Sequence, residues 1–459
     1  MKLITDLKER LEKQVIKKII CNLNYDSNDD LIKLADIAKK LTPTNKDSIE
    51  NIKELIRADH PATQLIRKIL KEIDSNCRDK IVSCLVLQGL LSNQKKKEKT
   101  IKEGGYAPTT ILISPTMRCN LKCIGCYAAN YSKQDDLDIK IIDRIIQEAK
   151  DIGVSFFTIL GGEPFIREDL FEIYAKHKDA YFQCYTNGTL INEKTIKKLL
   201  ELGNVMPIIS IEGYEAETDE RRGKGTYKKI VWVMDELKKN KIPFGFSVNV
   251  TSKNADLISS DEFIDFLINK GAYLGWLFMY MPVGREPDLK LMPTPEQRKM
   301  LLGRVTHIRA TKPIFIVDFW NDAPWVGGCI AGKEYIHINS KGDVEPCIFT
   351  HFAVDNIKNK SLKEVMNSPY FQELRKRQPY DENLFLPCMW IDHPQVSREI
   401  HQKFNVYPTH PGADEILTKE NLRQGLDEYA QRVKEIYDPI WADYLKEHPE
   451  LKSTNKPKQ

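Results

Sequence analysis

Several features of other protein classes are missing from this sequence of 459 residues. No hydrophobic run approaches the roughly 20 residues needed to cross a membrane, and the N-terminus lacks the apolar core of a signal peptide. The net charge is only +4 although 29% of the residues are charged, which argues against a broad basic surface for nucleic acid. The ten cysteines come without a secretory segment and are better explained as reduced thiols or metal ligands than as disulfides. We therefore expect a cytoplasmic globular protein of two or three domains.

Three cysteines, Cys119, Cys123 and Cys126, fall within eight residues directly after a strand-like segment, 110–115. Thiolates at this spacing can hold one zinc ion or one iron–sulfur cluster. A structural zinc needs a fourth nearby ligand, but the next candidates, His177 and Cys184, lie some fifty or more residues further on. Three ligands on a four-iron cluster leave one iron free to bind another molecule.

The C-x3-C-x2-C spacing after a strand resembles the radical S-adenosylmethionine (SAM) superfamily. The resemblance implies a [4Fe–4S] cluster on the three cysteines, with SAM bound to the fourth iron through its amino and carboxylate groups. It also implies an enzyme that cleaves SAM with one electron to a 5′-deoxyadenosyl radical, which abstracts a hydrogen atom from substrate. Gly125 stands where the family often has an aromatic residue. Tyr127 is our candidate for the contact with adenine, the alternative being packing on the rim of the fold.

Strand and helix patterns alternate six times between residues 106 and 283, which predicts parallel strands covered by helices. The predicted strands are 110–115, 154–160, 181–186, 206–211, 244–250 and 274–281. The predicted helices are 138–151, 168–178, 192–202, 227–240 and 260–270. The fold class is therefore α/β, a partial TIM-like (β/α)6 barrel open on one side. By analogy with complete barrels, we expect the active site at the carboxyl ends of the strands.

The residues at these strand ends resemble the SAM-binding segments of the family. Glycines allow close approach to a ligand, a carboxylate suits the SAM ammonium, and a guanidinium suits its carboxylate. The candidates are Gly161, Gly162, Glu163 and Pro164 after the second strand, Thr186 and Asn187 after the third, Ser210 and Glu212 after the fourth, Arg222 before the next helix, and Asn249 on the fifth strand. The segment at Thr186 is also a good turn on its own account, and many relatives carry Asp where Glu212 stands. Tyr280 and Arg285 are candidates for the substrate side, and the radical step itself requires no acid–base residue.

A second cysteine set follows the predicted barrel. Twelve residues separate Cys329 from Gly342 and four separate Gly342 from Cys347, across a segment, 333–344, that predicts a hairpin. This spacing is similar to the opening of the family's cysteine-rich extensions, called SPASM when long and twitch when short. With Cys388 as a third ligand, the resemblance implies one auxiliary [4Fe–4S] cluster in a shortened, twitch-like arrangement. Its fourth ligand stays open among His393, Asp392, His351 and a free iron, and one zinc with a histidine is the alternative.

The chain is expected to divide into an N-terminal helical domain (1–105), the barrel (106–283), the auxiliary region (284–395), and C-terminal helices with a polar tail (396–459). Helical patterns also run over 28–41, 46–58, 62–75, 79–93, 295–309, 415–426 and 427–445, and a strand over 313–318. The first amphipathic pattern, formed by Leu3, Leu7, Leu11, Val15 and Ile19, docks on its own bundle or lies on a membrane surface.

These observations predict a radical SAM oxidoreductase or transferase that modifies an unactivated C–H position. Its partners would be a small-molecule or lipid-like substrate and a flavodoxin- or ferredoxin-type electron donor, in an anaerobic host. Modification of a peptide or protein, as in the maturases of ribosomal peptides, is the alternative. We favour it less because the helical N-terminus lacks the strands of a leader-peptide-binding module. The alternative from another class is a non-catalytic iron–sulfur electron carrier or a zinc-binding protein.

Overall fold

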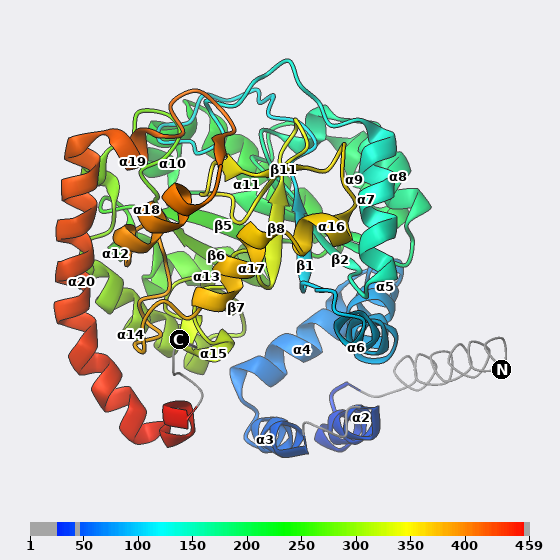
Figure 1. Cartoon of the computed structure of the whole chain (residues 1–459). Coiled ribbons are helices and arrows are strands. Elements are labelled where there is room, and N and C mark those ends of the chain that lie inside the picture. The colour runs from blue at the N-terminus through cyan, green and yellow to red at the C-terminus, as the bar shows by residue number, and fades with distance from the viewer. Residues whose placement is uncertain (1–24, 42–45, 454–459) are drawn as a thin grey trace.

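The computed structural model describes residues 25–41 and 46–453, and the helix predicted over residues 3–19 lies outside them. A ten-stranded sheet forms the centre of the described chain, with helices around it (Figure 1). Its strand order is β11-β9-β8-β1-β2-β3-β4-β5-β6-β7. The six predicted central strands are β1 (Thr110–Ile113), β2 (Phe156–Ile159), β3 (Tyr181–Thr186), β4 (Val205–Ser210), β5 (Gly245–Val250) and β6 (Leu274–Met279).

Two further strands extend this parallel set. β7 (Phe315–Asp318) pairs with β6, and β8 (Tyr335–Ile338) pairs with β1, both in parallel. The sheet ends in antiparallel strands β9 (Asp343–Glu345) and β11 (Asp355–Asn356). The strand and the hairpin predicted in the auxiliary region are both present, but we had not expected them to join the barrel sheet. The auxiliary region therefore supplies part of the barrel wall.

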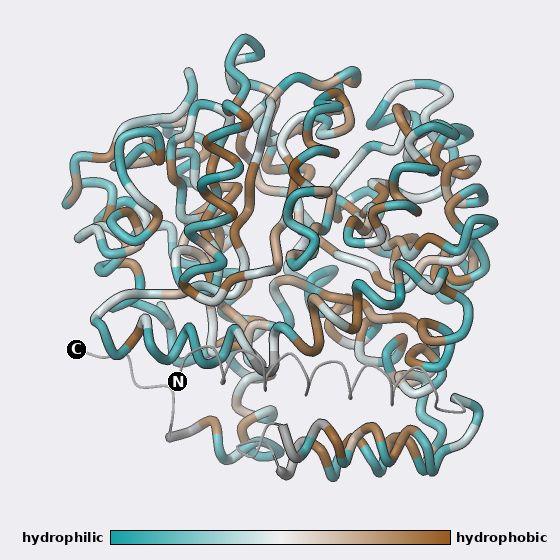
Figure 2. Tube along the Cα trace, turned by 90° about the vertical axis from the view of Figure 1, so that its right-hand side faces the viewer, coloured by the Kyte–Doolittle hydropathy of each residue, from teal (hydrophilic) through white to brown (hydrophobic). Residues whose placement is uncertain are grey.

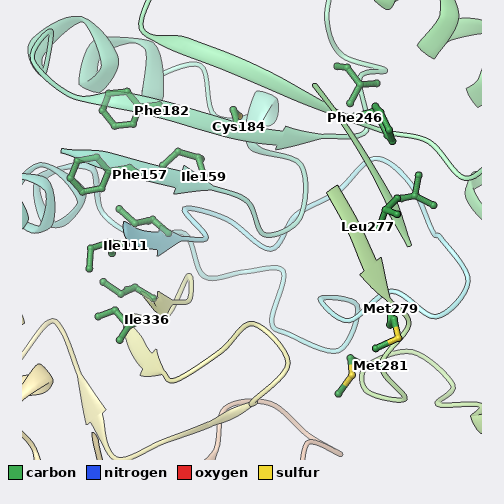
Figure 3. Close-up of a cluster of buried hydrophobic side chains, with 14 of the residues drawn as sticks. Ile111, Phe157, Ile159, Phe182, Cys184, Phe246, Leu277, Met279, Met281 and Ile336 are labelled. Carbon is green, nitrogen blue, oxygen red and sulfur yellow. The ribbon is translucent and has the colours of Figure 1, made fainter. Parts of the chain in front are cut away.

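Alternate residues of each strand face opposite sides of the sheet. Figure 3 shows the outer set, in which Ile336, Ile111, Phe157 and Phe182 stand on four neighbouring strands. These side chains are fully buried beneath the surrounding helices, and the thiol of Cys184 is buried among them. The inner set carries hydroxyl, amide and aromatic groups, and this set surrounds the cavity described below.

The helices between the strands match the predicted amphipathic patterns, and hydrophobic residues recur along the helices around the sheet (Figure 2). They are α7 (Ile139–Asp151), α8 (Leu170–Lys176), α9 (Glu193–Leu202), α11 (Thr226–Lys239) and α13 (Asp261–Lys270). Between the six central strands, two short α-helices were not predicted, α10 (Glu215–Arg222) and α12 (Ala255–Ile258). α10 has the sequence EAETDERR, which contains no large apolar residue and so carries no periodic signal.

The N-terminal helices lie below the sheet in Figure 1. They are α2 (Asn28–Leu41), α3 (Lys46–Arg57), α4 (Pro61–Glu72), α5 (Ser75–Lys80), η2 (Ile81–Asn93) and α6 (Gln94–Lys102). η2 is a wide π-helix, a rare form over such a length. Its Cys84 packs with Tyr181, Met206 and Ile208 of β3 and β4, so η2 covers the amino end of the barrel.

The C-terminal part is mostly helical. Its elements are α14 (Pro295–Thr311), α15 (Ala323–Val326), β10 (Phe352–Ala353), α16 (Leu362–Met366), α17 (Pro369–Arg377), α18 (Pro394–Lys403), β12 (Tyr407–Pro408), α19 (Glu415–Thr418) and α20 (Glu420–Glu447). We predicted a helix boundary near residue 426, but α20 runs through it without a break. A single buried stripe explains the continuity, formed by Leu422, Leu426, Ala430, Val433, Tyr437 and Trp441. Within the described residues, no helix has the length and apolarity required to span a membrane.

Candidate functional site

A cavity of about 270 Å³ lies inside the sheet and reaches the carboxyl ends of the strands. Most of the residues singled out from the sequence line it. They are Cys119, Cys123, Cys126, Tyr127, Gly161, Gly162, Thr186, Asn187, Ser210, Arg222, Asn249 and Tyr280. Glu163, Glu212 and Arg285 do not line the cavity, and the contacts below give each of them a supporting position. Pro164 does not line it either and is buried at the start of a short 3-10 helix, η3 (Pro164–Ile166).

The loop with the first three cysteines is tied to neighbouring loops by backbone contacts. The Glu163 N–H donates to the Arg118 carbonyl at 2.8 Å, and the Arg285 N–H donates to the Cys126 carbonyl at 3.1 Å. The Arg285 guanidinium also donates to the Cys123 carbonyl at 2.9 Å. Arg285, which we expected on the substrate side, therefore fastens the cysteine loop.

The paired glycines after β2 are required by close packing against the same loop. A Cβ at Gly161 would lie 2.5 Å from the Thr116 carbonyl oxygen, and one at Gly162 would lie 2.1 Å from that of Arg118. Gly161 also has a φ of +114°, which disfavours any residue with a side chain. The glycines thus let the β2 loop touch the cysteine loop directly.

Glu163 is fully buried and holds the next loop in place. Its carboxylate accepts hydrogen bonds from the Thr186 hydroxyl (2.7 Å) and from the backbone N–H groups of Asn187 (2.8 Å) and Phe165 (3.1 Å). Burial nevertheless raises the pKa of Glu163 to about 6. These bonds use three of about four lone-pair positions, so the carboxylate can take one more donor.

Glu212 binds two arginines. Its Oε1 accepts hydrogen bonds from Arg221 Nη1 and Arg222 Nη2, each at 2.5 Å, and its Oε2 accepts one from the Asn249 N–H at 3.0 Å. Glu212 therefore orients Arg222 in the cavity wall. The Asn249 side-chain Nδ2 is buried at this cavity and finds no acceptor among the described residues. Such a donor suits a bound polar ligand.

Gly125 and Tyr280 fit together, which no sequence signal predicted. Gly125 has a φ of +60°, and a Cβ there would lie 2.6 Å from the Tyr280 ring. The Tyr280 ring therefore occupies the space that a side chain at position 125 would need. The Tyr127 ring packs against Phe349, with ring centroids 5.9 Å apart, and so joins the cysteine loop to the auxiliary region.

The second cysteine set lies across the cavity. Cys347 is buried and Cys329 and Cys388 are half-buried, while their neighbours Ile330, Ile348 and Phe349 line the cavity. The Tyr335 hydroxyl donates to the Cys347 sulfur at 3.0 Å. Burial raises the pKa of Cys329 to about 12 and that of Cys347 to about 11.

Sulfur atoms in both sets accept a backbone N–H from two residues further along the chain. The donors are Leu121 to Cys119 (3.5 Å), Phe349 to Cys347 (3.5 Å) and Trp390 to Cys388 (3.4 Å). Hydrogen bonds of this kind stabilise thiolates and tune the clusters that they hold. Soft thiolate donors that accept such hydrogen bonds fit an iron–sulfur cluster.

Comparison with known proteins agrees with this geometry. Residues 113–260 match the radical SAM superfamily, and residues 329–389 match the SPASM iron-sulfur cluster-binding domain. The mycofactocin maturase MftC of Mycolicibacterium smegmatis is 30% identical over 301 residues, covering 60% of this chain and 75% of that protein. The chain belongs to the radical SAM superfamily. An AdoMet-dependent heme synthase of Methanosarcina barkeri is 28% identical over 300 residues, covering 59% of this chain and 85% of that protein.

Solved radical SAM structures have the same fold. Streptococcus suis SuiB bound to precursor peptide SuiA gives a TM-score of 0.51 at 22% identity, covering 63% of this chain and 71% of that one. The anSMEcpe structure with AdoMet and the Cp18Cys peptide gives a TM-score of 0.53 at 18% identity, covering 72% of this chain and 99% of that one. The predicted α/β barrel, the enzyme class, the SAM-binding [4Fe–4S] cluster and the auxiliary iron–sulfur region are thereby confirmed.

The three side chains considered as a fourth auxiliary ligand are engaged by other protein groups in this radical SAM enzyme. His351 bonds the Ile348 carbonyl (2.9 Å) and His410 (2.7 Å), and His393 bonds the Leu386 carbonyl (2.8 Å). Asp392 pairs with the fully buried Arg298 at 2.5 Å and accepts the Cys388 N–H at 2.9 Å. These contacts favour an auxiliary centre held by three cysteines.

Proposed function

We propose that this radical SAM enzyme modifies a C–H position of a peptide. From the sequence we favoured a small molecule or lipid and kept a peptide as the alternative. The relatives support the alternative better: MftC is named a maturase, and SuiB and anSMEcpe were solved with bound peptides. The heme synthases among the relatives make a small molecule the second candidate.

The observation that carries the proposal is one continuous cavity between the two cysteine regions. The same cavity contacts Cys119, Cys123 and Cys126 on one side and Ile330 and Phe349, beside the auxiliary cysteines, on the other. A substrate group held there would lie against both regions at once. One residue of a longer peptide can enter such a cavity while the rest of the peptide stays outside it.

The side chains of the site have separate tasks in this proposal. Cys119, Cys123 and Cys126 would hold the cluster, which together with SAM supplies the radical that takes a hydrogen atom from substrate. The buried Glu163 carboxylate and the Arg222 guanidinium have the charges to receive an ammonium and a carboxylate. The apolar walls exclude water, which protects reactive species from side reactions.

Anaerobic reconstitution with iron and sulfide, followed by dithionite and SAM, tests the enzyme. We expect 5′-deoxyadenosine, measured by chromatography and mass spectrometry, and we expect Cys123→Ala to abolish it. Cys184→Ala is the matched control, because Cys184 is buried on the outer side of the sheet. Equal loss of product in both variants would contradict the role assigned to Cys123.

The substrate class is tested with extracts of source cells grown in deuterated medium. The extract is divided by size, and half of each fraction is treated with a protease. If the substrate is a peptide, deuterium enters 5′-deoxyadenosine with untreated polypeptide fractions and not after proteolysis. Deuterium transfer from the low-mass fraction that survives proteolysis would instead support the small-molecule candidate.

A further inference from the structure

The inner half of the cavity has an aromatic wall. Tyr185, Trp276, Phe278, Phe319 and Tyr335 form it, from four strand regions of the barrel. The Trp276 and Phe278 rings are stacked, with centroids 5.6 Å apart and planes within 3°. Aromatic side chains of this kind offer large contact area to a bulky apolar group.

The amino end of the barrel is closed beneath this wall. η2 packs against the first residues of the strands, and Tyr185 and Trp276 lie against the same hydrophobic cluster. A group that enters the cavity therefore comes from the cysteine side and ends against this closed amino end. The N-terminal helical region thus sets the depth of the chamber.

In the described part of the chain, the inner half of the cavity, away from the strand ends where Arg222 would receive the SAM carboxylate, offers no partner for a second charged group. Among the described residues that line it there is no Asp, Glu, Lys or His. The two arginines in the lining, Arg221 and Arg222, are both bound to Glu212. A charged side chain in the inner half would be desolvated and unpaired, which is strongly unfavourable.

Trp276 carries a hydrogen-bond donor, and the lining of the cavity also includes the polar side chains of Thr158, Gln183 and Ser247. The Trp276 Nε1 is buried and has no acceptor among the described residues. Trp276 stands beside Ser247 of β5 in the register of the sheet, and Ser247 pairs in turn with Ser210 of β4. Buried donors are nearly always satisfied in folded proteins, so an orphaned indole N–H at a cavity indicates a ligand acceptor.

We propose that Trp276 determines substrate specificity by selecting an uncharged, bulky side chain that carries an oxygen acceptor for its indole N–H. The inference rests on the proposed peptide function, since it names the kind of residue that enters the chamber. The aromatic wall supplies the apolar contact, the missing charges exclude Lys, Arg, Asp and Glu, and the indole distinguishes groups with an acceptor from groups without one.

Four matched probes test this: p-cresol, toluene, p-toluate and 4-methylbenzylamine, each added to the oxidised, SAM-bound holoenzyme. Affinities come from saturation-transfer NMR, and the position of binding comes from the six tryptophan indole N–H signals of 15N-labelled protein. The Trp276 signal is assigned by its loss in Trp276→Phe. We expect p-cresol to shift this signal and to bind roughly 3- to 10-fold more tightly than toluene. Both charged probes should bind at least about tenfold more weakly than p-cresol.

Trp276→Phe should remove the preference for p-cresol over toluene, whereas the control Trp232→Phe, on α11 and outside the cavity, should keep it. If the variant does not fold, triple-resonance assignment of the wild-type protein identifies the same Trp276 signal, so the wild-type spectrum still tests the proposal. A charged probe that binds as tightly as p-cresol, or an unmoved Trp276 signal at saturating p-cresol, would overturn it. Probe binding does not depend on turnover. Correct probe selection with no deuterium transfer from peptides would therefore reject the peptide function alone.

Discussion

Replacement of Arg298 by Met should destabilise the auxiliary region strongly. Arg298 on α14 and Asp392, four residues after Cys388, are both fully buried, with Nη1 and Oδ1 2.5 Å apart. A second guanidinium nitrogen, Nη2, donates to the Phe385 carbonyl at 2.6 Å. Met keeps most of the side-chain volume but leaves the Asp392 carboxylate buried without its cation.

The size of the expected loss in unfolding free energy follows from the burial of this ion pair. Removal of one partner of a buried ion pair costs about 3–5 kcal/mol, because the remaining charge stays desolvated. Arg432→Met is the matched control: its partner Glu296 also lies on α14, at 3.0 Å, but the two side chains are 60% and 59% exposed. An exposed pair contributes at most about 1 kcal/mol. The two variants should therefore differ by at least about 2 kcal/mol.

The assay is unfolding of the holoprotein in guanidinium chloride under anaerobic conditions, followed by circular dichroism, with iron measured per chain. Arg298→Met should unfold at a clearly lower denaturant concentration than Arg432→Met. It should also lose iron, since Asp392 positions the Cys388 backbone. Equal unfolding midpoints for the two variants would refute the assignment of a strong stabilising role to the buried pair.

Three further predictions concern single positions. Gly162→Ala should abolish SAM cleavage, because its Cβ would lie 2.1 Å from a backbone oxygen of the cysteine loop. An active Gly162→Ala enzyme would contradict this packing argument. Gly303→Ala is the control: a Cβ at Gly303 on α14 meets open space, so this change should stabilise the protein by roughly 0.5–1 kcal/mol in thermal unfolding. Gly125→Ala should weaken SAM binding by roughly tenfold in calorimetry, since it displaces the Tyr280 ring; unchanged affinity would show that the ring position is unimportant. Burial raises the pKa of Asp318 to about 6, so the folded state binds more protons than the unfolded state between about pH 4 and 6 and stability falls as pH rises. The free energy of unfolding of Asp318→Asn should therefore rise by about 1–2 kcal/mol relative to that of the wild type between pH 5 and 7.5. If the unfolding free energies of the two proteins depend on pH in the same way, this prediction is wrong.

The sequence was sufficient for most of the fold because each element carries its own pattern. β3 (YFQCYT) and β6 (LGWLFM) are short runs rich in aromatic and apolar residues, and α13 has an N-cap Ser260 and a C-terminal Gly271, so local signals mark where they begin and end. The pairing of β8 with β1 joins residues 225 positions apart, as Tyr335 and Thr110 show. No local signal encodes that contact.

The site could be predicted in part for the same reason. Cys119, Cys123 and Cys126 are close in sequence and follow a strand, so their spacing alone indicated a shared ligand. The Gly125–Tyr280 fit and the binding of Arg222 by Glu212 depend on loops from different strands. The role of Arg285 in holding the cysteine loop depends on a contact across 162 positions of the chain. These relations follow only from the folded barrel.

The pairing of β1 with β8 also has a consequence for biosynthesis. One edge of β1, the strand that leads into the first cysteines, has no neighbour until the chain has been synthesised through residue 338. A nascent chain therefore leaves this edge unpaired while residues 114–338, about half of the chain, are synthesised, as long-range strand pairing generally requires. Iron–sulfur insertion at Cys119, Cys123 and Cys126 would then meet a complete barrel only after the ribosome has passed the auxiliary hairpin. Delivery of the first cluster is in this way tied to synthesis of the segment that receives the second.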